Sequence, residues 1–112
     1  MEIKKISYAA ENEHYNKELF LIQEEGLSMT FGTVFLMKGT RIPEKGFSKH
    51  EQHEISVIQQ GKIEMLNENG TIKGYLTAGD VVFITALEAQ AGNVLEETQI
   101  IYTLFGKKGK NK

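Results

Sequence analysis

The stretch that decides the fold is His50-Glu51-Gln52-His53-Glu54-Ile55-Ser56-Val57-Ile58-Gln59-Gln60-Gly61. It begins as a cluster of His and Glu residues and continues as a β-patterned run that ends at a glycine. Eighteen residues after that glycine, a second such run begins with Gly79-Asp80-Val81-Val82-Phe83-Ile84. Short runs rich in β-branched and aromatic residues, bounded by turn formers, are typical of strands. The stretch therefore predicts an ionisable cluster that leads directly into a strand.

Similar strand patterns cover most of the remaining chain. The predicted strands are 18–23, 29–37, 55–58, 62–66, 71–76, 81–84 and 99–105. The Asn69-Gly70 pair between two of them predicts a hairpin, because both residue types accept positive φ. No helix signal is longer than a turn or two. Eight or nine short strands without a long helix predict an all-β barrel or jelly-roll sandwich.

Composition limits the class of protein. A chain of 112 residues with 40% hydrophobic and 25% charged residues is expected to form a single globular domain over 1–112. The absence of Cys excludes disulfides and thiolate metal sites. The net charge is −2 and the basic residues cluster only in 106–112, which we expect to be a disordered tail. This balance argues against a nucleic-acid partner. Without a long apolar segment or a secretory leader, the sequence predicts no membrane association and a cytoplasmic location.

The His/Glu cluster resembles the first sequence motif of the cupin family. Glu54, six further residues and Gly61 match the second half of that motif. Counting back from Glu54 places the second His position of the motif on His50 and the first on Ser48. Gly39 lies about three residues too early for the motif's opening glycine, so the intervening loop is longer than in the family pattern.

The second run resembles the second cupin motif only at its start. Gly79 and the strand that follows match well, but Thr85 stands at the proline position, Leu87 at the glycine position and Gln90 at the His position. Val94 stands at the position of the final Asn. Glu54-Ile55 and the loss of the later His are also similar to the ethanolamine-utilisation branch of cupins. The resemblance covers roughly half the chain and implies a small RmlC-like cupin, a double-stranded β-helix.

The resemblance also implies a ligand site inside the barrel. Cupins hold Fe, Mn, Ni or Zn with three His and one carboxylate, which suits such borderline cations. The corresponding set here is His50 and Glu54, with His53 or Gln90 as further ligands of one divalent metal. In an extended strand His50 and Glu54 share parity, whereas His53 points to the opposite face. The third histidine, His14, is expected on the surface.

Without a metal, the same positions predict a pocket for a small polar molecule. Its ligand-binding residues are expected to be Ser48, His50, Glu54, Gln90 and, by its shared parity with Gln90, Glu88. Glu54 is the candidate general base, because desolvation raises a carboxyl pKa. The alternative for Glu54 is a structural carboxylate tied to backbone or to Arg41.

Three functions follow from these residues and from the resemblance. The first is a protein that binds a small polar molecule in the barrel, with or without a divalent metal. The second is a metal-dependent isomerase or dioxygenase of a small substrate, and the third a metal-free structural or regulatory cupin. The family commonly forms homodimers, and the long apolar strand 29–37 is expected to provide an exposed edge for such a dimer.

Overall fold

The structure is a computed structural model that describes residues 1–10 and 15–107. The strands are β1 (Asn16–Glu24), β2 (Leu27–Leu36), β3 (Arg41–Ile42), β4 (His53–Leu66), β5 (Ile72–Thr77), β6 (Val81–Ile84) and β7 (Gly92–Lys107). Across these described residues the only regular elements are strands, which confirms the all-β prediction. No helix in the described ranges is long and apolar enough to cross a membrane.

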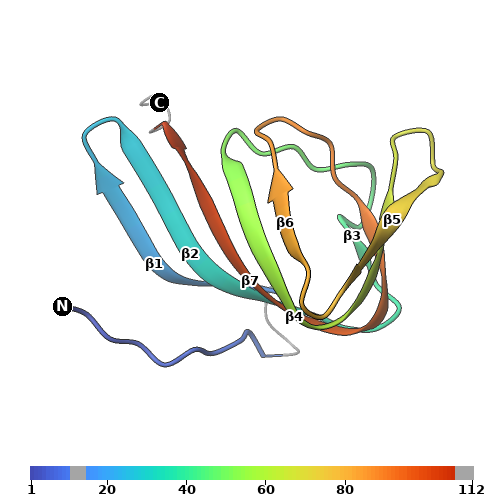
Figure 1. Cartoon of the computed structure of the whole chain (residues 1–112), viewed down its shortest axis with the longest axis horizontal. Coiled ribbons are helices and arrows are strands. Elements are labelled where there is room, and N and C mark those ends of the chain that lie inside the picture. The colour runs from blue at the N-terminus through green and yellow to red at the C-terminus, as the bar shows by residue number, and fades with distance from the viewer. Residues whose placement is uncertain (11–14, 108–112) are drawn as a thin grey trace.

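The strands form one antiparallel sheet whose two longest members bend through the middle of the molecule. Its order is β1-β2-β7-β4-β5, with β3 paired to β7 and β6 paired to β4. The sheet curls so that β3, β5 and β6 lie beside the bent halves of β4 and β7 (Figure 1). The result is a barrel with β1 and β2 extending its wall to one side.

Strand β4 is continuous where the sequence predicted two separate strands. Its first half pairs with β6 and β7, its second half with β5 and β7, and the register shifts between Ile58 and Ile63. Gly61 lies in this bulge with φ of +108°, so it bends the strand without ending it. The bulge also changes which positions face inward: Ile58 and the even-numbered residues before it line the barrel, and then the odd-numbered Ile63 and Met65 do.

Two further expectations about strands are corrected. Residues 106 and 107 were predicted to begin a disordered tail, but they belong to β7 and pair with Ser28 and Leu27. Residues 108–112 and His14 lie outside the described residues. The strand predicted over 29–37 is not an edge, because β2 lies between β1 and β7.

The predicted hairpin at Asn69-Gly70 is present between β4 and β5.

The hydrophobic core lies inside the curl of the sheet. Its buried members are Leu36, Ile58, Ile63, Val94 and Ile100, against which Val34, Ile42, Met65 and Leu76 pack. Several of these side chains also line the cavity described below. The core and the candidate site therefore share one wall.

Candidate functional site

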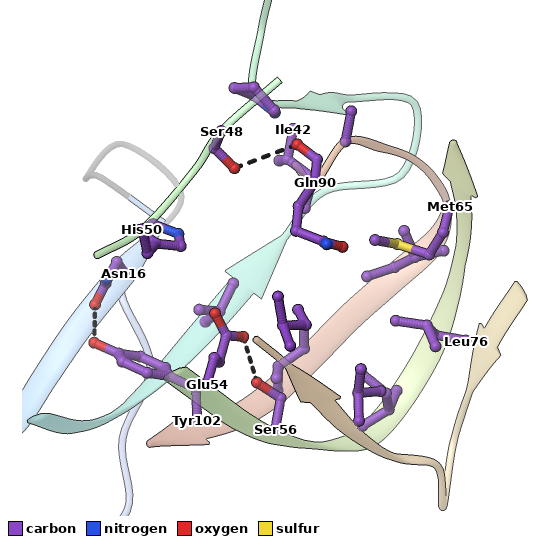
Figure 2. Close-up of a pocket in the computed structure, with 18 of the residues that line it drawn as sticks. Asn16, Ile42, Ser48, His50, Glu54, Ser56, Met65, Leu76, Gln90 and Tyr102 are labelled. Carbon is purple, nitrogen blue, oxygen red and sulfur yellow. Dashed lines mark hydrogen bonds between the residues drawn. The ribbon is translucent and has the colours of Figure 1, made fainter. Parts of the chain in front are cut away.

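A short bridge between two loops brings both cupin-like motifs together. The backbone N–H of Ser48 donates to the Gln90 carbonyl at 2.9 Å, and the Gln90 N–H donates back to the Ser48 carbonyl at 2.8 Å. The Ser48 hydroxyl also donates to the Gln90 carbonyl at 3.3 Å (Figure 2). The two positions, 42 residues apart, thus lie side by side at the opening of the barrel.

A turn centred on Leu87 attaches the His50 loop to the loop after β6. The Leu87 N–H donates to the His50 carbonyl at 2.7 Å. Among the described residues, Leu87 is the only one other than glycine with a positive φ, at 68°. This is the position that the second motif assigns to glycine, the residue type that adopts positive φ without strain. His50 itself is exposed at the edge of the cavity.

Replacing Leu87 by glycine is expected to stabilise the protein. A residue with a Cβ is strained by roughly 1–2 kcal/mol in the left-handed region, and glycine is not. The Leu87 side chain is 62% exposed, so little packing is lost. After the entropic cost of glycine, we expect Leu87→Gly to raise the free energy of unfolding by about 0.5–1 kcal/mol. Urea denaturation checks this, and a decrease would show that the Leu87 side chain makes stabilising contacts.

Glu54 and Ser56 occupy successive inward positions of β4. Both backbones are fixed by pairing with β6 on one side and β7 on the other. The Ser56 hydroxyl donates to Glu54 Oε2 at 2.5 Å (Figure 2). Arg41, the alternative partner expected from the sequence, donates instead to the carbonyls of Pro43 and Gly46. Glu54 is therefore held by a neutral hydroxyl, and Arg41 does not pair with it.

The side chain of Gln90 reaches from the loop bridge into the cavity (Figure 2). Its amide nitrogen is buried and makes no hydrogen bond of good geometry within the described part of the protein, although the Gln90 side chain lies close enough to Glu88 to contribute to the lowered pKa of that carboxyl. A buried donor left unpaired costs about 1–3 kcal/mol. Such groups are rare in folded proteins and call for an explanation.

Tyr102 completes the polar end of the cavity from β7. Its hydroxyl donates to Asn16 Oδ1 at 2.6 Å (Figure 2). Burial raises the pKa of the Tyr102 phenol, the Asn16 hydrogen bond lowers it, and the charges of Glu18 and Glu54 raise it further. The phenol is thus kept neutral in a region of negative potential.

Three members of this polar end were not predicted from the sequence. Ser56 shares strand parity with Glu54, and that signal was visible. Asn16 and Tyr102 are 86 residues apart. They meet only because β2 pairs with both β1 and β7, which no local pattern indicates.

The cavity has a volume of about 180 Å³. Most of its wall is apolar and comes from strands β2 to β7 and the loops between them; these residues are Val34, Ile42, Pro43, Ile58, Ile63, Met65, Leu76, Val82, Ile84, Ala91, Ile100 and Leu104. The polar lining residues are Tyr15, Asn16, Ser48, His50, Glu54, Ser56, Gln90 and Tyr102. Over the described ranges 1–10 and 15–107, the lining contains one carboxylate and neither Lys nor Arg.

Two of the predicted site residues lie elsewhere. His53 is on the outer face, where its ring contacts Phe83 and Phe105 at centroid distances of 5.7 and 5.6 Å. Its Nδ1 accepts the Ala86 N–H at 3.0 Å. The odd position in β4 turns it away from the cavity, so it cannot join a ligand set with Glu54.

Glu88 is the second predicted site residue that lies outside the cavity. It pairs with Lys73 at 3.0 Å and accepts the Thr85 N–H at 3.2 Å. The hydrogen bond from Lys73 is the largest effect that lowers the pKa of Glu88. Parity with Gln90 failed as a guide because Glu88 closes the turn at Leu87, where its N–H donates to the Thr85 carbonyl at 3.0 Å, and is not part of an extended strand.

The donor set does not fit the metal that the cupin resemblance implies. Within residues 1–10 and 15–107, no three His, Cys, Asp or Glu side chains are grouped so as to hold a metal ion. At the four motif positions only His50 and Glu54 are strong ligands, while Ser48 and Gln90 supply a hydroxyl and an amide. Such neutral oxygen donors suit hard cations better than Fe, Ni or Zn.

No family model and no curated protein matches the sequence, whereas solved structures share its fold. The cupin domain of Cnp3 from Schizosaccharomyces pombe superposes with a TM-score of 0.62 at 20% identity, over 83% of this chain and 64% of its own. An RmlC-like cupin from Shewanella frigidimarina superposes with a TM-score of 0.57 at 17% identity, over 91% of this chain and 92% of its own. EutQ from Clostridium difficile superposes with a TM-score of 0.59 at 19% identity, over 82% of this chain and 67% of its own.

These structures define the class: the chain has the cupin fold, as predicted from its motifs. At 17–20% identity the likeness establishes the architecture alone. Function must therefore be argued from the residues of the cavity.

Proposed function

We propose that this protein is a cupin that binds a small molecule directly with the side chains of its barrel, without a resident transition metal. The observation that carries the proposal is the buried amide nitrogen of Gln90, which lacks a well-formed hydrogen bond, in a largely apolar cavity. A ligand with a hydrogen-bond acceptor would satisfy this donor and remove the cost of leaving it unpaired.

The arrangement of the wall supports this proposal. A largely apolar pocket with a few convergent polar groups is the usual form of a small-molecule site. Here the polar groups gather around Glu54, Gln90 and Tyr102, and the apolar wall lies opposite (Figure 2). A cavity of about 150 Å³ holds benzene, so about 180 Å³ suits a ligand of similar size with one or two polar substituents.

The probe 3-hydroxybenzyl alcohol tests the proposal. Its ring matches the apolar wall and each hydroxyl can reach a polar side chain. We expect binding, followed by chemical-shift changes in two-dimensional NMR spectra at Glu54, Ser56 and Gln90. Absence of any shift at these residues at millimolar probe would overturn the proposal.

Two variants on β6 test whether the probe binds inside the barrel. Val82 lines the cavity, whereas its neighbour Val81 is 69% exposed on the outer face. We expect Val82→Phe to fill part of the cavity and weaken probe binding at least tenfold. Val81→Phe makes the same chemical change outside and is expected to leave affinity unchanged. Equal affinity of the two variants would show that the probe binds elsewhere.

A further inference from the structure

The charge of the cavity indicates the class of ligand. Among the lining residues that the structure describes, Glu54 is the only acid, and none is Lys or Arg. From this we infer that the pocket selects a small primary amine, bound as its ammonium ion by Glu54, over neutral and anionic molecules of the same shape. The inference rests on the proposed function and adds the ligand's charge to it.

The geometry of Glu54 supports a cationic ligand. Ser56 occupies only Oε2, and Oε1 makes no hydrogen bond among the described residues. The carboxylate faces the same space as the Gln90 amide (Figure 2). A charged donor bonded to a carboxylate away from bulk water is held more strongly than a neutral one.

The surroundings of Glu54 add to its preference for a cation. The Tyr102 hydroxyl donates to Asn16, so its remaining lone pairs can only accept hydrogen bonds. Burial and the charges of Glu18 and Glu54 raise the pKa of this phenol, which is the effect expected where negative potential opposes a further anion. An anionic ligand would meet this potential without any neighbouring basic side chain other than His50 at the edge.

The Gln90 side chain indicates a second property that the ligand should have. Its unpaired amide nitrogen is a donor, and an ammonium group has no lone pair to accept from it. The ligand is therefore an amine whose apolar body also carries a hydrogen-bond acceptor, such as a hydroxyl or carbonyl oxygen. Glu54 and Gln90 would then each bind a different polar group of one molecule.

Three probes of similar size that differ in the charge of one ring substituent test the inference at neutral pH: 3-hydroxybenzylamine, 3-hydroxybenzyl alcohol and 3-hydroxybenzoate. We expect the amine to bind about tenfold more tightly than the alcohol, and the acid to bind most weakly. Titration by NMR or calorimetry gives the three dissociation constants. An amine no tighter than the alcohol would overturn the inference and leave the proposed function standing. If none of the three binds, both are overturned.

Two matched variants on β4 test whether Glu54 is the side chain that causes the preference for the amine. Glu54→Gln keeps the shape and an acceptor for Ser56 but removes the charge, and we expect it to abolish the preference for the amine. Glu64→Gln makes the same change in net charge at a residue that does not line the cavity and instead accepts from Asn93. It is expected to retain the preference. An unchanged preference in Glu54→Gln, or its loss in Glu64→Gln, would contradict the assignment to Glu54.

Discussion

Replacing Gly61 by alanine is expected to destabilise the protein by about 3–5 kcal/mol, or to prevent folding altogether. At a φ of +108° an alanine is strained. A Cβ at this position would also lie 2.5 Å from Thr98 Cα and 2.6 Å from the Glu97 carbonyl oxygen. These are backbone atoms of the paired strand β7, so a rotamer change cannot relieve the contact.

The structure around Gly61 has little room to adjust. Thr98 is fully buried. Its hydroxyl accepts the Lys62 N–H at 3.2 Å and donates to the Glu96 carbonyl at 2.8 Å. Separating β4 from β7 would break this connection at the bulge. Chemical denaturation of Gly61→Ala provides the measurement.

A second glycine provides the matched control. Gly26 has φ of +74°, and a Cβ there would meet no atom within 4 Å. Gly26→Ala is therefore expected to cost only the conformational penalty, about 1 kcal/mol. Similar losses in the two variants would show that the close approach of β7 contributes nothing.

The second large effect is expected at Gly32, which pairs with Tyr102 across β2 and β7. A Cβ at Gly32 would lie 2.6 Å from the Tyr102 hydroxyl oxygen, 2.8 Å from Cζ and 2.5 Å from the Lys17 carbonyl oxygen. The ring and β1 would both have to move. We expect Gly32→Ala to lower the free energy of unfolding by about 2–4 kcal/mol. The same displacement is expected to weaken binding of 3-hydroxybenzyl alcohol, because the Tyr102 hydroxyl leaves Asn16.

A double-mutant cycle separates the two contacts of Gly32. Tyr102→Phe removes the hydroxyl oxygen but not the collision with Lys17, so Gly32→Ala is expected to cost less in that background, by about 1 kcal/mol. Denaturation of the four proteins gives the coupling energy. A coupling near zero would mean that the Tyr102 hydroxyl contributes nothing to the loss, which would then come from the Lys17 carbonyl and the ring carbon Cζ that phenylalanine retains.

The parts of the site that could be predicted are those fixed by short-range spacing. Counting from Glu54 and Gly61 assigned motif positions to Ser48 and His50, and counting from Gly79 assigned one to Gln90. The structure places all of these except the glycines at one cavity. Strand parity also separated Glu54 from His53, because both lie in one extended strand.

The rest depended on pairing between distant segments. Gly61 ended a strand in the sequence prediction, since a glycine serves equally in a turn and in a bulge. Only its contact with Thr98 on β7 decides for the bulge. Tyr102 likewise enters the site through its register opposite Gly32. Local patterns contain neither relationship.

The pairing of β4 with β7 also bears on how the protein folds. It joins residues as distant as His53 and Phe105, and β2 pairs Leu27 with Lys107. Chains dominated by such non-local contacts typically fold in milliseconds to seconds, because loop closure precedes the stabilising contacts. The hairpins β1–β2 and β4–β5 require only local closure. We therefore expect the cavity to form late in folding, when β7 has joined both hairpins and brought Tyr102 to Asn16.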